Sequence, residues 1–291
     1  MQLFVNDLTV MDFSYLCPER GMVGESWIVD VVLDGELNEE SMVLDFGKVK
    51  KELKFLIDEY VDHKLLVPVE HEYSQITRDP NTDEVTVDFL RPNGKSIHLV
   101  CPAEAYAFVY SSTVTIPSVG QYLKDVIATH LPSNVDGIEL ILRPEIIETP
   151  FYHYTHGLKK HDGNCQRIAH GHRSKVLVFE DGKLSNKWQQ YWASRWEDIY
   201  IGSQDDIVDG SNHPFENDNV SFNEHYIFQY ESSQGEFSLA IPKSESEIIQ
   251  TDSTVECLAQ YMAYELKSLA QDSGFKVLAF EGVGKGAIAF A

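Results

Sequence analysis

The chain has 291 residues, of which 43% are hydrophobic and 11% aromatic, which is typical of a folded protein with one large or two ordinary domains. Its formal net charge of −23 makes nucleic acid and anionic lipid unfavourable partners. No apolar run approaches the ~20 residues of a membrane helix, and the N-terminus lacks a secretion signal, so we expect a cytoplasmic protein. No C-x-x-C pair or disulfide framework is indicated by the scattered cysteines Cys17, Cys101, Cys165 and Cys257.

The first half of the chain predicts one α+β unit. Residues 3–16 alternate apolar and polar side chains, as a half-buried strand does, and the strand-like run 25–37 contains the Asp-Gly pair of a tight turn. Apolar residues then recur at helical spacing from Val49 to Tyr60. The elements expected next are an inserted hairpin at 83–90 and 95–101, a helix at 117–131 and a strand at 137–146.

The second half begins with a strand again. Ser253 is the expected N-cap of a helix, with Glu256 as its capping-box partner. The tryptophan-rich and then acidic stretch 186–222 matches no clear pattern, and we assign no element to it. The elements expected are strands at 151–158 and 172–184, a hairpin at 225–242, a helix at 253–269 and strands with a glycine turn at 275–291.

The two halves resemble each other, which indicates an internal duplication. Residues 24–37 align with 171–184 without a gap, so that Gly24 falls on Gly171 and one Asp-Gly pair on the other. A second match, a helix followed by a strand, occurs in the same order in both halves. We therefore predict an α+β fold of two repeated units, at 1–148 and 149–291.

The candidate catalytic and metal-binding residues differ between the two halves. Val23 and Glu25 stand where the second half has His170 and His172. Conversely, the pair Asp62-His63 has no clear counterpart in the second half. The losses are complementary, so we expect each half to supply part of one site.

His170 and His172 flank a glycine at the start of a predicted strand. Side chains two residues apart on a strand point to the same face, so the two imidazoles are a ready pair of zinc ligands. A third ligand from the preceding strand would complete a site with one open position. His156 is our choice, with His153 and His161 as competitors, and a surface turn without metal is the structural alternative.

Cys165 precedes this histidine pair by five residues. A metal and nearby cations would lower the pKa of its thiol and make it a general base or nucleophile; a small buried thiol is the alternative. The local formal charge from 156 to 176 is +4, which indicates either an anionic substrate such as a phosphate chain or a solvated basic loop. The basic residues are Lys159, Lys160, Arg167, Arg173 and Lys175, opposed by Asp162.

Two further groups carry weaker signals. Asp62 could orient or charge His63 for proton transfer, although a cation stabilised by a helix C-terminus is a structural alternative. Glu281 follows the predicted strand at the C-terminus and could accept paired N–H donors from a heterocycle. Alone, it would be an ordinary strand-end glutamate.

Together these pieces resemble the 6-pyruvoyl-tetrahydropterin synthase family, which includes 6-carboxy-tetrahydropterin synthase. The resemblance touches both halves, with the motifs divided between them. The stretches that carry it are Met42–Phe46, Asp62–Leu66, Tyr152–His156, Cys165 with His170-Gly171-His172, Ser253–Glu256 and Glu281.

The resemblance implies tandem tunnelling-fold (T-fold) units, each an antiparallel sheet with helices on one face, that assemble into barrels with active sites between units. It implies a zinc-dependent lyase acting on 7,8-dihydroneopterin triphosphate or a close relative, with formation of a 6-carboxy- or 6-pyruvoyl-tetrahydropterin. Zn²⁺ would be held by His156, His170 and His172. We accordingly expect a homo-oligomer with a small-molecule substrate.

The resemblance also implies roles for the other residues. Cys165 would abstract a carbon-bound proton, and His63, oriented by Asp62, would return or relay one. Glu281, with Glu256, would hold the pterin ring, and the triphosphate would face Lys159, Lys160, Arg167 and Arg173. The alternative is a non-catalytic pterin- or purine-binding T-fold protein, because a partly degenerate duplication is the kind of chain that could lose catalysis.

Overall fold

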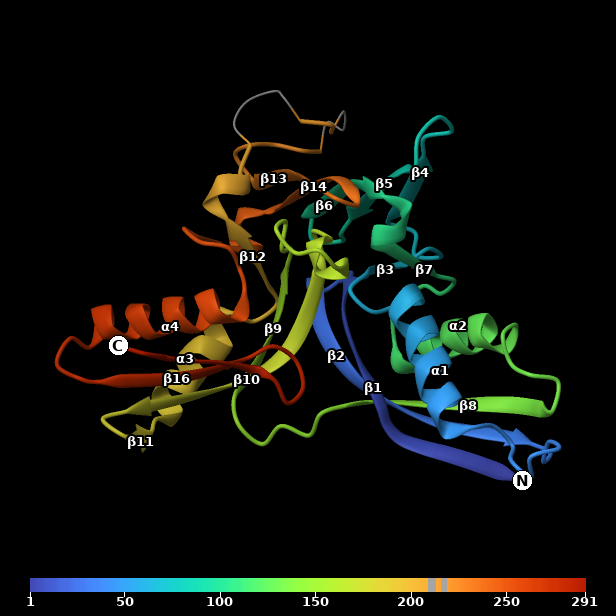
Figure 1. The fold of residues 1–291 in the computed structure, drawn as a ribbon. Helices are drawn as coiled ribbons and strands as arrows, with labels where there is room; N and C mark the ends of the chain where they lie inside the picture. Colours follow the sequence, from blue (N-terminus) through green and yellow to red (C-terminus); the bar gives the residue numbers. More distant parts are fainter. Residues whose placement is uncertain (209–212, 216–218) are drawn as a thin grey trace.

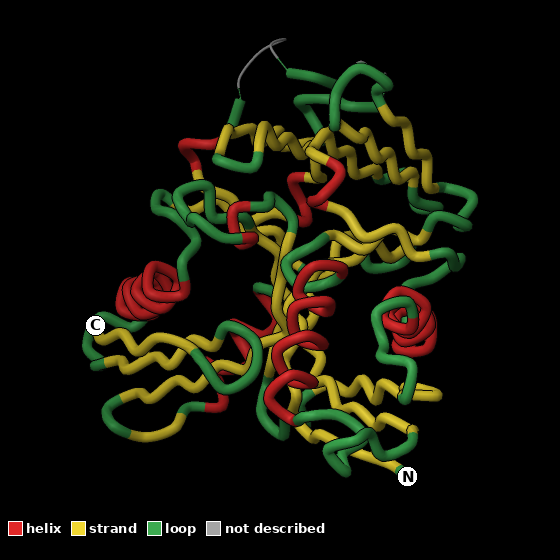
Figure 2. Tube along the Cα trace, turned by 45° about the vertical axis from the view of Figure 1, so that its right-hand side comes forward, coloured by secondary structure: helices red, strands yellow, loops and turns green. Residues whose placement is uncertain are grey.

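The computed structural model describes residues 1–208, 213–215 and 219–291. Figure 1 shows two sheet-and-helix units, one from each half of the chain, with a third sheet lying across one end of both. Figure 2 shows the same arrangement turned by 45°, with helices flanking the sheets of the two units. Among the described residues, no helix is both long enough and apolar enough to cross a membrane.

The first unit has a long antiparallel hairpin at the centre of its sheet, in the strand order β7-β3-β1-β2-β8. Helices α1 (Phe46–Tyr60) and α2 (Ile116–Ala128) bury their apolar stripes in the same core as this sheet. The Asp45 side chain caps α1 by accepting a hydrogen bond from the Lys48 backbone N–H. The strands are β1 (Gln2–Cys17), β2 (Gly21–Gly35), β3 (Leu65–Pro68), β7 (Tyr106–Val109) and β8 (Val135–Pro144).

The second unit repeats this order as β15-β12-β9-β10-β16, with β17 added at the edge and β11 paired to β10. The prediction of an α+β fold of two repeated units is thereby confirmed, although β3, β7, β12 and β15 run parallel to their neighbours in otherwise antiparallel sheets. The strands are β9 (Phe151–His156), β10 (His170–Glu180), β11 (Lys183–Leu184), β12 (Ile199–Ser203), β15 (Ser246–Ile249), β16 (Phe275–Phe280) and β17 (Gly286–Phe290), and the helices are α3 (Asn186–Arg195) and α4 (Val255–Leu269).

Helix α3 and strand β12 lie in the stretch 186–222 to which the sequence assigned no element, and part of that stretch lies outside the described residues. Trp188, Trp192 and Trp196 recur every four residues and are buried in the core of the second unit. This spacing is the helical signal that the polar residues around it obscured.

The third sheet has the order β13-β14-β6-β5-β4 and contains strands from both halves. Both expected hairpins are present, but they also pair with each other, since β14 lies antiparallel to β6. The insertions therefore tie the halves together. The strands are β4 (Ser74–Arg78), β5 (Glu84–Leu90), β6 (Ser96–Pro102), β13 (His225–Ser232) and β14 (Gly235–Pro242).

The two units meet where equivalent residues face each other. Ser14 pairs with Gly24 in the first hairpin, and Thr155 pairs with Gly171 in the second. A Cβ on Gly171 would lie 2.6 Å from the Gly24 Cα, and the Ser14 and Thr155 hydroxyls are hydrogen-bonded at 2.7 Å. An approximate two-fold axis therefore passes between the glycines, and it brings β1 and β2 against the start of β10.

Candidate metal centre and catalytic site

Strands β9 and β10 bring three imidazoles together in the second unit. His156 pairs with His170 across the strands, and His172 lies two residues further along β10. All three are buried, and each offers a ring nitrogen within 4.8 Å of the other two. The Nε2 atoms of His156 and His172 are 3.2 Å apart. Two nitrogen ligands of a tetrahedral zinc ion would be separated by roughly 3.3 Å, so the donor set and its spacing fit zinc.

The other ring nitrogen of these histidines is held by neighbouring groups. His156 Nδ1 lies 2.9 Å from the Ser253 carbonyl oxygen, and His170 Nδ1 lies 3.0 Å from the Arg167 carbonyl oxygen. Such partners fix the tautomer that leaves Nε2 free for a metal. Burial lowers the pKa of both histidines well below its ordinary value, which favours the neutral, metal-binding form.

Asp12 of β1 faces the other ring nitrogen of His172, and sequence reasoning missed it. Its Oδ1 lies 3.2 Å from His172 Nδ1, an ion-pair contact without hydrogen-bond alignment, and accepts a hydrogen bond from the Ser26 hydroxyl at 2.5 Å. Burial alone would raise the pKa of Asp12, but His172, Lys285 and Ser26 outweigh it and hold that pKa far below its ordinary value. Asp12 thus places a negative charge beside a candidate metal ligand.

Asp62, His63 and Cys165 form a group beside this centre. Asp62 accepts from the Asp12 backbone N–H at 2.7 Å, and its other carboxylate oxygen lies 2.6 Å from His63 Nδ1. The Cys165 sulfur and ring nitrogens of His63 and His170 lie within 4.8 Å of one another, and the His63 and His170 ring centroids are 5.0 Å apart. Burial opposes the charged imidazole, but Asp62 and Cys165 outweigh it and raise the pKa of His63 to about 10. The structure therefore joins Asp62-His63 from the first half to the second-half cluster within one chain.

The backbone of His63 is in the left-handed region, with φ of 56°. This conformation is uncommon for residues other than glycine, although histidine adopts it more often than most. A hydrogen bond of 2.7 Å from the His63 N–H to the Asp12 carbonyl oxygen supports it. The turn after α1 is thus shaped to direct this imidazole at the cluster.

The two predicted pterin-binding glutamates differ in their surroundings. Glu281 follows β16, is partly buried, and lies 3.7 Å from Lys285, which also contacts Asp12. Glu256 is exposed in the first turn of α4. The predicted N-cap of α4 was wrong by one residue: Thr254 accepts from Cys257 N–H, because Ser253 contacts His156 instead.

The basic cluster predicted from the sequence is divided in the structure. Lys159, Lys160 and Arg173 are each bound to a neighbour outside the metal centre, whereas Arg167 is buried in the electrostatic range of Cys165. The partners are Asp206 for Lys159, Asp252 for Lys160 at 2.7 Å, and the carbonyl oxygen of Glu145 for Arg173 at 2.7 Å.

The competing histidines lie elsewhere. His153 Nδ1 lies 2.7 Å from the Gly24 carbonyl oxygen, and exposed His161 accepts from the Gly163 N–H at 2.9 Å. Of the three candidates for the third ligand, His156 is the one that the fold places with His170 and His172.

The first unit has a counterpart of this centre with different residues. The strand registers place Tyr15, Val23 and Glu25 at the positions of His156, His170 and His172. Asp198 takes the position of His63 and shares its left-handed backbone, with φ of 52°. The Arg20 guanidinium donates to both Asp198 carboxylate oxygens, at 2.8 and 2.5 Å, and to the Tyr15 hydroxyl at 3.1 Å. The counterpart is therefore filled by an ion pair.

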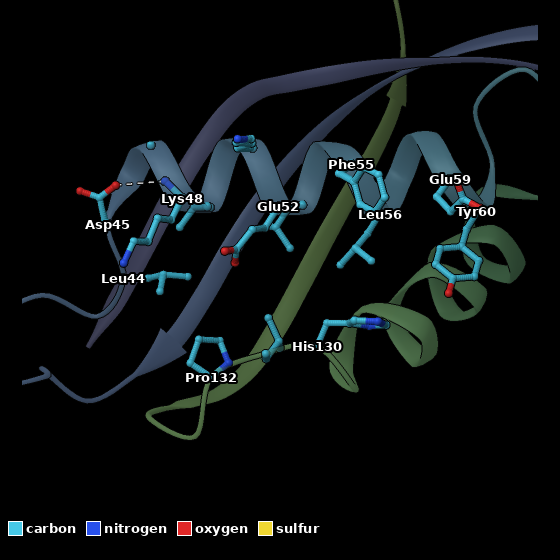
Figure 3. A pocket seen from close by; sticks show the side chains of 15 residues that line it. Leu44, Asp45, Lys48, Glu52, Phe55, Leu56, Glu59, Tyr60, His130 and Pro132 are labelled. Atoms are coloured by element: carbon cyan, nitrogen blue, oxygen red, sulfur yellow. Dashed lines mark hydrogen bonds between the residues drawn. The ribbon is translucent and has the colours of Figure 1, made fainter. Parts of the chain in front are cut away.

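A cavity of about 890 Å³ lies away from both places, in the first unit. Figure 3 shows Phe55 and Leu56 of α1 on one side of it and His130 and Pro132 opposite. None of the metal-centre residues lines this cavity, so it has no part in the chemistry considered below.

Comparison with known proteins identifies the family. Residues 17–140 and 145–281 each match the family model described as 6-pyruvoyl tetrahydropterin synthase. The chain belongs to the 6-pyruvoyl tetrahydropterin synthase family. The two adjacent matches agree with the duplication inferred from the sequence, and family membership supports an enzyme of the pterin synthase type.

No curated protein matches the chain. Among solved structures, it is similar to a catalytic-residue mutant of Plasmodium vivax 6-pyruvoyltetrahydropterin synthase, with 14% identity over 49% of this chain and 90% of that one and a TM-score of 0.40. A second structure of the P. vivax enzyme has 13% identity over 49% and 97% of the chains, with a TM-score of 0.38. The Plasmodium falciparum enzyme has 12% identity over 49% and 90%, with a TM-score of 0.39.

Proposed function

We propose that this protein is a zinc-dependent lyase that converts 7,8-dihydroneopterin triphosphate, or a close relative, to a 6-carboxy- or 6-pyruvoyl-tetrahydropterin. One observation carries the proposal: a buried three-histidine group lies directly against a Cys165–His63–Asp62 chain. The family match supports the pterin class of substrate.

Each residue of the site is suited to a separate catalytic role. His156, His170 and His172 would hold Zn²⁺, which when bound supplies Lewis acidity toward a substrate oxygen. Cys165 would remove a carbon-bound proton as its thiolate. His63, whose pKa of about 10 keeps it protonated at neutral pH, would stabilise that thiolate and return a proton, and Asp62 would orient it.

Substrate binding would involve groups at the edge of the centre. Glu281, partly buried next to Lys285, would accept the N–H donors of the pterin ring, with Glu256 from α4 as a further candidate. Of the four cations predicted to face the phosphates, Arg167 has the burial and proximity to Cys165 that this role requires.

We also propose that the chain consists of a first unit at 1–148, which supplies Asp62-His63, and a second unit at 149–291, and that it forms a homo-oligomer in the cytoplasm. Strands β8 and β17 end their sheets without a further partner strand among the described residues. Exposed apolar side chains on them favour pairing with another copy, namely Ile141, Ile288 and Phe290.

The test is turnover of 7,8-dihydroneopterin triphosphate by purified protein, followed by mass spectrometry of the pterin products, together with metal content per chain. Cys165→Ala should abolish turnover and keep zinc, whereas His170→Ala should lose zinc. Full activity of the Cys165→Ala protein would refute the role of the thiol. One zinc per chain with no turnover of any pterin triphosphate would favour the non-catalytic pterin- or purine-binding protein.

A further inference from the structure

The Arg167 side chain has an unmet capacity for hydrogen bonding. The residue is 3% exposed, its Nε donates to Gln234 at 3.1 Å, and its Nη1 is buried with no hydrogen-bond partner among the described residues. A buried guanidinium donor without an acceptor is costly, and such groups in native proteins usually face a ligand, an ion or water. Its carbonyl oxygen holds His170, so the residue is fixed beside the metal centre.

Lys64 is a second buried cation in the same place. It is 7% exposed, and within the described part of the chain its Nζ makes no hydrogen bond or ion pair. Burial and repulsion from Arg167 lower the pKa of Lys64 to about 8, while the charges of Glu59 and Glu104 oppose this without an ion-pair contact. Two buried like charges that lack a contacting counterion destabilise the fold unless an anion joins them.

The duplication provides an internal comparison. Counting back from the aligned Gly24 and Gly171, Arg20 corresponds in sequence to Arg167, and the residue at the position of His63 is Asp198, which neutralises the Arg20 guanidinium through two hydrogen bonds. The position of Lys64 is held by an uncharged residue, Ile199. The second-unit site therefore has an additional cation and lacks the carboxylate, which leaves room for an external negative charge.

We propose that Arg167 and Lys64 together bind a phosphate group of the substrate. This assignment rests on the proposed function, since it states which residues hold the anionic end of that substrate. Cys165 and His63, which lie near Arg167, remain partly exposed, so a substrate can reach this part of the site. The cations that the sequence offered for this task, Lys159 and Lys160, are already paired with aspartates.

Binding of inorganic tripolyphosphate to the zinc-loaded protein, measured by calorimetry, tests the pair without any turnover. Losing one of two charge-assisted partners typically weakens binding by about 10- to 100-fold. We therefore expect at least a tenfold loss for Lys64→Gln and for Arg167→Gln. Lys160→Gln is the matched control, because it removes an exposed lysine of the same basic cluster, and its affinity should equal that of the unmodified protein.

Thermal unfolding without anion gives a second readout. Lys64→Gln should raise the melting temperature because it removes a repulsion, whereas a merely structural lysine would lower it on removal. No binding by the unmodified protein, or equal binding by the Lys64→Gln protein, would overturn the assignment, and so would a loss confined to Lys160→Gln. If both site variants lose anion binding but the unmodified protein turns over no pterin, the anion site is upheld and the proposed function is rejected.

Discussion

Glu25 stands at the register position of His172, and its burial gives a stability prediction with a defined magnitude. The side chain is 10% exposed, accepts the Ser26 N–H at 3.0 Å, and lies 3.9 Å from His153. Burial raises the pKa of Glu25 to about 7 from an ordinary 4.5, although Ser26, Arg173 and Arg20 oppose the shift. The folded state therefore holds the proton more tightly than the unfolded state. The contribution of Glu25 to stability is therefore greatest below about pH 4.5 and is lost as pH rises through about 7.

Each pKa unit corresponds to about 1.4 kcal/mol, so ionised Glu25 costs on the order of 3 kcal/mol, of which about 2 appear between pH 5.5 and 8.5. Glu25→Gln mimics the protonated carboxyl and should remove this loss. Urea unfolding at pH 5.5 and 8.5 measures the difference. Glu36→Gln, at an exposed position, should leave the pH dependence of the unmodified protein unchanged. An identical pH dependence in the Glu25→Gln protein would refute the reasoning.

Three further outcomes follow from the same geometry. Asp12→Asn should weaken zinc binding by about 10- to 100-fold in a chelator competition, because it removes the charge beside His172, and an unchanged affinity would contradict that role. Gly171→Ala should lower the free energy of unfolding by more than about 2 kcal/mol, since its Cβ would lie 2.4 Å from the Tyr154 carbonyl oxygen; Gly137→Ala, into open space, should change it by less than about 1 kcal/mol. Removing zinc with a chelator should lower the melting temperature, and adding it back should restore the temperature; a melting temperature insensitive to chelation would argue against a metal in the native fold.

The elements that the sequence predicted correctly are those fixed by local periodicity. Residues 3–16 alternate and residues 25–37 form a strand-like apolar run, and neither pattern requires knowledge of the partner strand. The pairing of β6 with β14 could not be predicted in this way. It joins residues about 140 positions apart, such as Leu99 and Leu239, and nothing in either strand specifies the other.

The residues of the candidate site likewise fall into those recognisable from local sequence and those that depend on tertiary packing. His170 and His172 were recognisable because their spacing on one strand places them on one face. Asp12 was not, because it reaches His172 only through the packing of the two units at Gly24 and Gly171. Counting charges likewise revealed Lys159 and Lys160 but not the distant aspartates that neutralise them.

The approximate symmetry shows why the three-histidine group is present in the second unit and not at the corresponding positions of the first. The strand registers make His172 equivalent to Glu25 and Asp12 equivalent to His153. Both sides of the axis therefore have a contact between a carboxylate and an imidazole, but the strand that carries each group is exchanged. The distance is 3.2 Å between His172 and Asp12 and 3.9 Å between Glu25 and His153. With the imidazole on β10, its free nitrogen faces two other histidines. With the imidazole on β9, it turns to the Gly24 carbonyl oxygen, and burial lowers the pKa of His153 to about 4. The same contact can thus serve packing in the first unit and metal binding in the second.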